Sequence, residues 1–154
     1  MKKVKIWTGT LFGAGLLPAA PGTWGSFFTL PLIYLASWLH PGIGLIVFLI
    51  LTIFLSLWSA PENVKQFGED PSQFVMDESA GQTVVFLTAG FHYTITEDLI
   101  LLLGGFLLFR IFDVLKPLGI KTLEKLSGKY GILADDLLAG LYALICLELL
   151  LLFI

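Results

Sequence analysis

The feature that most constrains this chain is a long stretch without charged side chains. From Ile6 to Pro61 the sequence contains no Asp, Glu, Lys or Arg. Within that stretch, residues 43–60 would form a helix about 27 Å long at ~1.5 Å per residue, which is close to the thickness of a bilayer's hydrocarbon core. The stretch therefore favours a chain that is embedded in a membrane.

Composition indicates the same class. Of the 154 residues, 56% are hydrophobic and 14% are charged, whereas roughly a quarter charged is ordinary for a soluble domain. A soluble protein of this size has too little interior to bury so much apolar surface. We expect one domain, residues 1–154, and no cleaved signal peptide, because glycines and prolines interrupt the region after the basic start.

Apolar segments separated by Pro, Gly and charged residues predict an all-α integral membrane bundle of about five short helices. The expected helices cover residues 27–39, 43–60, 79–91, 98–115 and 136–154. Connections are expected at residues 62–76, 92–97 and 116–133, and a Gly/Pro-rich N-terminal loop at 13–26. The first and third helices are short, so each of them either crosses a thin region or re-enters from one side.

If all five segments cross, every basic residue falls on one side of the membrane. The nine basic residues are Lys2, Lys3, Lys5, Lys65, Arg110, Lys116, Lys121, Lys125 and Lys129. Positive charge favours the cytoplasmic side, although so small a sample also allows chance. We therefore expect the N-terminus and the connections at 61–78 and 113–135 to face the cytoplasm.

The same topology gathers acidic residues where apolar helices meet the cytoplasmic loops. These residues are Asp77, Glu78, Asp113, Asp135 and Asp136. Acids at a membrane boundary are costly unless they are paired or bind a cation, and hard cations such as Mg²⁺ prefer carboxylate oxygens. Separate helix ends could therefore build a divalent-metal site, with one member of each adjacent pair capping a helix instead.

Residues 109–117 contain the most specific pattern. Arg110, Asp113 and Lys116 are three apart and so share one helix face. Arg suits bidentate phosphate binding, and Lys contacts phosphate as a point charge. A plain salt bridge between Arg110 and Asp113 explains that pair equally well when it is taken alone. The other acids at the same depth favour a site for metal and phosphate.

The Gly/Pro-rich loop is a weaker candidate for contact with an anion. Glycines permit close backbone approach, and amides at a helix start attract phosphate. Thr23, Gly25 and Ser26 are therefore candidate substrate-binding residues, although a plain entry turn fits as well. Further along, Gly81 and Gly140 follow the acidic pairs and could let helices approach closely.

Four motifs together resemble the phosphatidylglycerophosphatase A family. They occupy residues 15–26, 77–81, 109–117 and 131–140, in the family's order and spacing. Met76 is the one departure, since some members have Trp there, and it affects no catalytic position. The resemblance implies an all-helical inner-membrane enzyme of phospholipid biosynthesis, which hydrolyses phosphatidylglycerophosphate to phosphatidylglycerol and phosphate with Mg²⁺ at the cytoplasmic face.

The family's acidic and basic motif positions fall on Asp77, Glu78, Arg110, Asp113, Lys116, Asp135 and Asp136. We assign the metal to Glu78, Asp113 and Asp136. Catalytic roles are assigned to the remaining four: Asp77 or Asp135 as general base, with Arg110 and Lys116 binding the substrate and neutralising the transferring phosphoryl group.

Two other classes of protein compete with this interpretation. A membrane phosphotransferase that uses nucleotide-activated lipids has a long Asp-Gly…Asp…Asp pattern, which this sequence lacks. A non-catalytic ion-binding protein would place ionisable groups near the middle of the membrane, whereas here they fall at helix ends. We expect membrane lipid and no nucleic acid as partners, and the oligomeric state, including a homo-oligomer, stays open.

Overall fold

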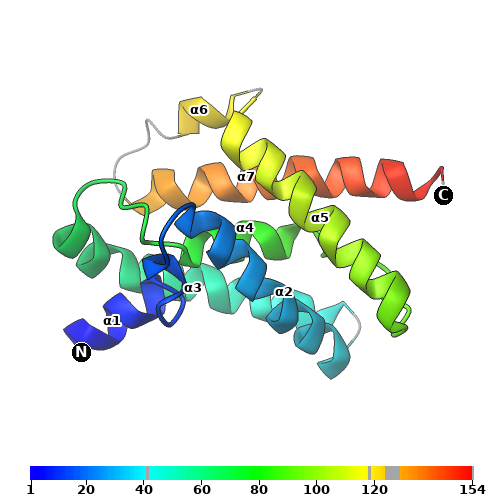
Figure 1. The fold of residues 1–154 in the computed structure, drawn as a ribbon, viewed down its shortest axis with the longest axis horizontal. Helices are drawn as coiled ribbons and strands as arrows, with labels where there is room; N and C mark the ends of the chain where they lie inside the picture. Colours follow the sequence, from blue (N-terminus) through cyan, green and yellow to red (C-terminus); the bar gives the residue numbers. More distant parts are fainter. Residues whose placement is uncertain (41, 118, 124–128, 154) are drawn as a thin grey trace.

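The computed structural model describes residues 1–40, 42–117, 119–123 and 129–153, and every regular element within them is helical (Figure 1). The long helices are α2 (Pro21–Leu39), α3 (Ile43–Phe67), α5 (Ile95–Leu115) and α7 (Lys129–Leu151). The short elements are α1 (Lys2–Gly9), the 3₁₀ turn η1 (Ala14–Leu16), α4 (Met76–Val84) and α6 (Ile120–Leu123). The prediction of an all-α fold is confirmed.

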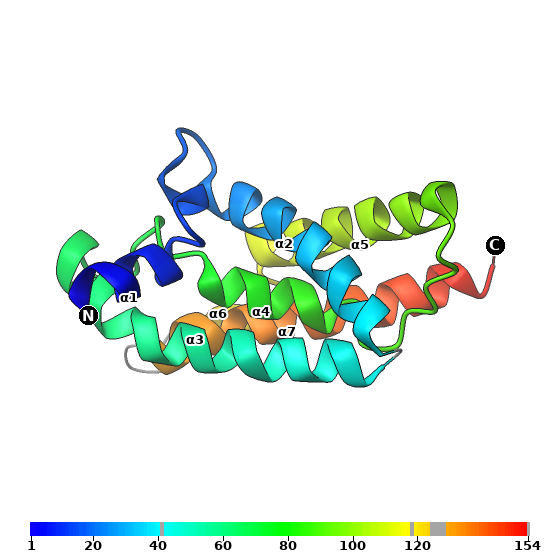
Figure 2. The same ribbon diagram turned by 90° about the horizontal axis from the view of Figure 1, so that it is seen from below.

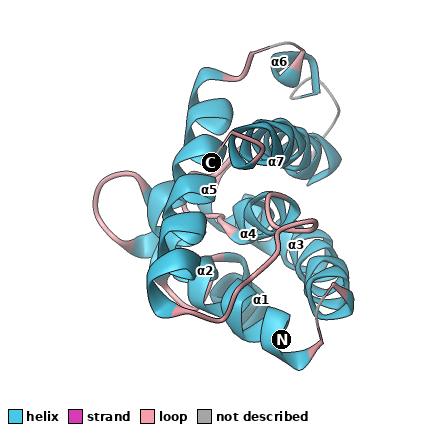
Figure 3. Ribbon diagram, turned by 90° about the vertical axis from the view of Figure 1, so that its right-hand side faces the viewer, coloured by secondary structure: helices cyan, strands magenta, loops and turns pink. Residues whose placement is uncertain are grey.

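Helix α4 lies at the centre of the fold. It packs against α2, α3, α5 and α7, and the view along the bundle shows it between these four helices (Figure 3). Every residue of α4 except Glu78 is buried. The polar side chains that begin this helix are therefore held in the interior of the protein.

Glycines allow α4 and α7 to approach each other closely, as predicted. A Cβ atom on Gly81 would meet the backbone of Asp136, and a Cβ atom on Gly140 would meet the backbone of Gly81. Helix-helix contacts in membranes are typically built on such small residues. This contact places the start of α7 directly beside the start of α4.

Helix α2 begins at Pro21 rather than at residue 27, so residues 21–26 form its first turns and not a loop. Proline fits the first turn of a helix because the amide it lacks would have no partner there. Glycine is needed next because a Cβ atom on Gly22 would clash with the carboxylate of Glu78. Glycine and proline, which predicted a loop here, instead form the tightly packed start of a helix.

Other helix ends also differ from the prediction. Helix α3 continues through Pro61 to Phe67, and Asn63 in this extension donates to the carbonyls of Ser59 and Lys5, which joins α3 to α1. Helix α4 already ends at Val84, and α5 and α7 begin earlier than predicted. Helices α1 and α6 had no counterpart in the prediction. Lys125 and the end of the last predicted helix at residue 154 lie outside the described residues.

The long helices run back and forth along one axis. The N-terminus, α1, the end of α3 and the start of α7 lie at one end of the bundle, which we call the α1 end (Figure 2). The C-terminus, the start of α3 and the start of α5 lie at the opposite end (Figures 1 and 2). Among the described residues, one helix, α3, is long and apolar enough to cross a membrane by length and composition.

Candidate active site

Charged side chains from α4, α5 and α7 line one cavity of about 240 Å³ together with the start of α2. Its charged lining residues are Asp70, Asp77, Glu78, Arg110, Asp113, Lys116, Asp135 and Asp136. All seven of the acidic and basic residues predicted for metal binding and catalysis are among them. Three helices that are distant in the chain therefore contribute to one cavity, whose walls carry more acids than bases. We call it the acidic cavity.

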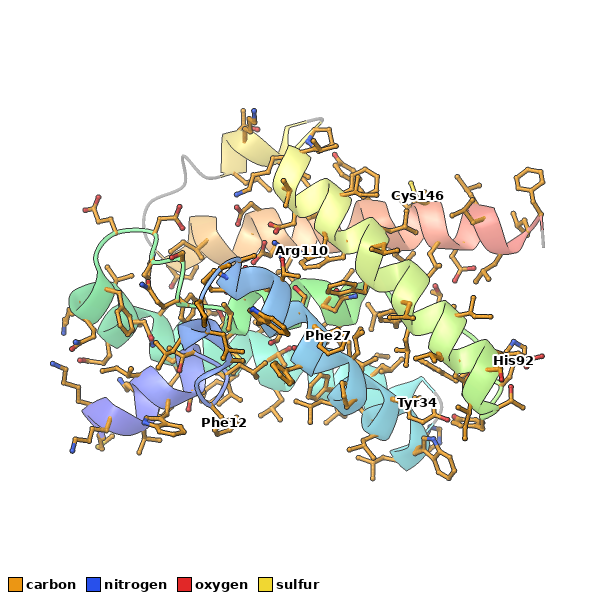
Figure 4. All side chains as sticks on the ribbon, in the orientation of Figure 1. Phe12, Phe27, Tyr34, His92, Arg110 and Cys146 are labelled. Carbon is orange, nitrogen blue, oxygen red and sulfur yellow. The ribbon has the colours of Figure 1, made fainter. Side chains whose placement is uncertain are left out.

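Arg110 is the cation that connects these helices. Its Nη1 donates to Glu78 Oε2 at 2.9 Å and lies 2.8 Å from Asp113 Oδ2. The salt bridge predicted between Arg110 and Asp113 is therefore present, and the same nitrogen also reaches α4. Arg110 belongs to the last two turns of α5, towards the α1 end of the bundle and far from His92 (Figure 4). The guanidinium Nε is buried and has no hydrogen-bond partner among the described residues.

Lys116 joins the end of α5 to the start of α7. Its backbone is left-handed, with φ of 46°, and its amide donates to the Phe112 carbonyl, which closes α5. Its Nζ lies 2.7 Å from Asp135 Oδ2, and the other oxygen of Asp135 accepts from the Asp136 amide. The turn at Lys116 thus aims its side chain back over the cavity.

Asp77 and Glu78 occupy the first turn of α4, which has nine residues and is too short to span a bilayer. Burial raises the pKa of Asp77 well above its ordinary value, and the charge of Glu78 raises it further. Burial raises the pKa of Glu78 to about 7, although Arg110 and Ser26 both oppose this effect. Asp77 Oδ1 is buried without a partner among the described residues.

These side chains suit a hard cation in chemistry, although they are not arranged as a finished metal cage. Among the described residues, no group of three or more Asp, Glu, His or Cys side chains is placed to hold a metal ion. Glu78 and Asp113 each give an oxygen to Arg110 instead. The lining nevertheless offers six carboxyl groups against two cations, and carboxylate oxygens are what Mg²⁺ prefers. The assignment of the metal to Glu78, Asp113 and Asp136 stays a prediction.

The three candidate substrate-binding residues from the start of α2 have different surroundings. Ser26 donates to Glu78 Oε2 at 3.2 Å and lies 3.4 Å from Arg110 Nη1, so it belongs to the charged network. Gly25 packs against Val75, where a Cβ atom would clash. Thr23 is half-buried and is not among the residues that line the cavity. Substrate binding by these three residues stays a prediction.

Two parts of the cavity wall carry none of the site residues assigned from the sequence. One is the turn into α2, residues 20–22, which belongs to the Gly/Pro-rich segment that was a weak candidate for anion contact. The other is residues 70–72 in the connection from α3 to α4, which was not predicted and carries Asp70 and Ser72 only a few residues before Asp77. A polar Asp-Pro-Ser sequence so close to the acidic pair was the signal that could have identified it.

Comparison with known proteins gives one family. The family model described as phosphatidylglycerophosphatase A matches residues 7–151. A Bacteroides thetaiotaomicron protein named "Putative phosphatidylinositol-3-phosphatase" is 36% identical over 89% of this chain and 87% of its own length. Proteins named "Phosphatidylglycerophosphatase A" from Haemophilus influenzae and Escherichia coli are 39% and 32% identical, over 87% and 84% of this chain and 80% and 73% of their own. No solved structure matches the chain.

Proposed function

The chain belongs to the phosphatidylglycerophosphatase A family, and from that premise we propose that it removes the terminal phosphate of phosphatidylglycerophosphate in phospholipid biosynthesis. One observation carries the proposal from the family to this molecule. Arg110 and Lys116 line a single cavity with carboxyl groups from three helices. Cations and buried carboxyl groups around one space are the groups that phosphoryl transfer requires.

We further propose that the protein is a multi-pass protein of the inner membrane with this cavity at the cytoplasmic face. Helix α3 supports membrane embedding, because only 33% of its most apolar window is buried within the protein. Basic residues support the orientation, because Lys2, Lys3 and Lys5 belong to α1 and Lys65 to the last turn of α3. Positive charge favours the cytoplasmic side of a membrane.

The charge of the cavity is the reason to include a divalent cation in the proposal. Six carboxyl groups and two cations would repel a phosphate dianion unless positive charge is added or acids are protonated. We assign Mg²⁺ to Glu78, Asp113 and Asp136. When bound, the ion supplies positive charge that polarises a phosphoryl oxygen.

The protein's own residues then divide the remaining work. Arg110 and Lys116 hold the phosphoryl oxygens and offset the negative charge that they carry. Asp77 suits proton transfer, because its Oδ1 has no partner among the described residues and burial raises its pKa. It takes a proton from the attacking water and returns one to the leaving alcohol, while Asp135 holds Lys116 in place.

The identity of the lipid head group is tested by the same experiment as the reaction. Purified protein in detergent micelles would be supplied with phosphatidylglycerophosphate or phosphatidylinositol 3-phosphate, with Mg²⁺ or with a chelator. We expect phosphate release from the first lipid, at least tenfold less from the second, and none with the chelator. Asp113→Asn should lose at least 99% of the turnover.

Each contrary result removes a defined part of the proposal. Faster phosphate release from the inositol lipid would contradict the proposed substrate. It would favour phosphatidylinositol 3-phosphate, as in the name of the Bacteroides relative. Full turnover with the chelator, or in Asp113→Asn, would remove the metal assignment. Saturable binding of a divalent ion without phosphate release from either lipid would favour a non-catalytic ion-binding protein.

A further inference from the structure

A second cavity, of about 360 Å³, lies on the other side of α2 and is lined by residues without polar side chains. The residues that line it are Leu11, Phe12, Gly13, Ala14, Leu17, Phe28 and Leu32. We call this cavity the loop groove, because residues 11–17 of the loop between α1 and α2 form one wall. The outer face of α2 forms the other wall.

Helix α2 separates the loop groove from the acidic cavity. Gly22 and Ser26 are buried on the face towards α4, where both meet Glu78. Phe28 and Leu32 are four residues apart and so share one face, and both side chains are exposed. The two faces of a single helix therefore have different surroundings, charged side chains on one side and apolar side chains on the other.

The two cavities come close to each other at the start of α2. Leu17 lines the loop groove, and Ala20 to Gly22 line the acidic cavity. Three residues of chain span at most about 11 Å. A ligand with an anionic head and an apolar tail is the chemical class that fits two such cavities, because it could reach both around the end of one helix.

The loop is held firmly while its apolar side chains face outward. Gly15 packs against the backbone of Gln73, with no room for a Cβ atom, and its amide donates to Thr10. Phe12 is nevertheless 70% exposed, and the loop projects from the side of the bundle (Figure 2). An anchored loop that exposes a phenylalanine presents a stable apolar surface.

Backbone strain is concentrated in the same loop. Leu11 and Phe12 at one end of it and Ala19 and Ala20 at the other have φ between 47° and 62°. Side chains with a Cβ atom rarely adopt this left-handed conformation, and strained residues cluster where a ligand is bound. The first pair shapes the groove wall, and the second pair turns the chain into the acidic cavity.

We propose that the loop groove binds one acyl chain of the phospholipid whose head-group phosphate enters the acidic cavity, an inference that rests on the proposed function. The groove at the opposite end of the bundle, between α5 and α7, has a larger volume of about 600 Å³. It is lined in part by His92, which lies at the other end of α5 from Arg110 (Figure 4). Its lining also includes the ionisable side chains of His92 and Glu97, whereas none of the residues that line the loop groove is ionisable.

The test compares chain-length preference in two matched variants. Leu32→Trp fills the loop groove, and Leu35→Trp makes the same change at an exposed position of α2 outside the groove. The measured quantity is kcat/KM for a long-chain lipid divided by kcat/KM for its water-soluble short-chain analogue. We expect Leu32→Trp to lower this ratio at least fivefold and Leu35→Trp to leave it within twofold of the native value. Equal ratios in the two variants would overturn the proposal.

A binding measurement separates this proposal from the proposed reaction. Vesicles of phosphatidylglycerol with a photoreactive group near the end of one acyl chain would be irradiated with the native protein and both variants. We expect cross-links to residues 11–17, reduced at least threefold by Leu32→Trp and unchanged by Leu35→Trp. Cross-linking spread evenly over the exposed apolar faces would overturn the groove. Cross-linking at the loop groove in a protein that releases no phosphate would contradict the proposed reaction but support acyl-chain binding in the groove.

Discussion

Both ends of the bundle carry acidic side chains, but the acids have different partners at the two ends. At the opposite end, Asp98 accepts from the His92 amide, Glu97 accepts from Thr94, and Glu148 accepts from Thr88. Two of these three bonds close a local turn or helix start, and none involves a cation. At the α1 end, the acids converge from three helices on Arg110 and Lys116.

Burial alone does not distinguish the acids at the two ends. Asp98 is 2% exposed and Asp136 is 4% exposed, yet only Asp136 lines a cavity with other carboxyl groups. An acid with a local donor stabilises a turn. Acids that face one another without enough cations cost free energy, and this cost indicates a site that awaits a ligand.

The largest difference between the two ends is expected when one buried aspartate at each end is neutralised. Asp136→Asn should lower kcat by roughly 10²–10³, because a charged group of the reaction site is lost. Asp98→Asn should leave kcat within about threefold, because its role is confined to the turn at His92. Phosphate release per folded protein measures both, and equal losses would show that the two ends do not differ in function.

A second test concerns the close contact of α4 with α7. Gly81→Ala should destabilise the protein by ~1–3 kcal/mol, because its Cβ atom would meet the backbone of Asp136. Gly104→Ala on α5 is the matched control, because no atom lies within 4 Å of its Cβ position. It should stabilise the protein by up to ~1 kcal/mol through helix propensity. Thermal unfolding in detergent measures both, and a stable Gly81→Ala would contradict the packing described for α4.

The α1 end should also be the part of the protein that makes stability depend on pH and divalent ions. Burial raises the pKa of Glu78 from its ordinary 4.5 to about 7. Between these values the folded protein binds more protons than the unfolded chain, so stability without metal should fall as pH rises.

A divalent cation competes with that proton, so Mg²⁺ should raise the melting temperature more at pH 8 than at pH 5.5. Its apparent affinity should be about thirtyfold lower at the acidic pH, if one proton with a pKa of about 7 must leave. Titrations of Mg²⁺ against thermal unfolding measure this, and Asp98→Asn should respond as the native protein does. The same affinity at both pH values would remove carboxylates from the ion's ligands.

The smallest effect is expected at the opposite end. Thr88→Val removes the hydroxyl that donates to Glu148 Oε1. It should cost about 0.5–1.5 kcal/mol and leave phosphate release unchanged, because that bond lies far from the acidic cavity. Any change in kcat per folded protein would show that the two ends are coupled.

The charged residues of the site were predictable, because each can be recognised from its residue type and from short spacings in the sequence. The helical spacing from Arg110 to Lys116 placed three charged groups on one face, and the structure brings them to one cavity. The acidic pairs at residues 77–78 and 135–136 were identified by their place at the ends of apolar segments. All seven of these residues meet in space.

The start of α2 was not predictable, because its glycines are required by contacts with distant parts of the chain. Gly22 is required by the carboxylate of Glu78, and Gly25 by the side chain of Val75. Neither neighbour is visible from residues 21–26 alone, which have the composition of a loop. The extension of α3 past Pro61 also packs on a distant part of the chain, since Asn63 donates to the Lys5 carbonyl of α1.

Helix α4 has a consequence for how the protein is made. A helix of nine residues is not stable alone, nor long enough to enter a bilayer as an independent unit. It must wait for α5 and α7, which follow it in the chain, before it has surfaces on which to pack. The acidic cavity therefore forms only after α7 has been synthesised, and we expect a ribosome-bound fragment that ends before α7 to release no phosphate from lipids.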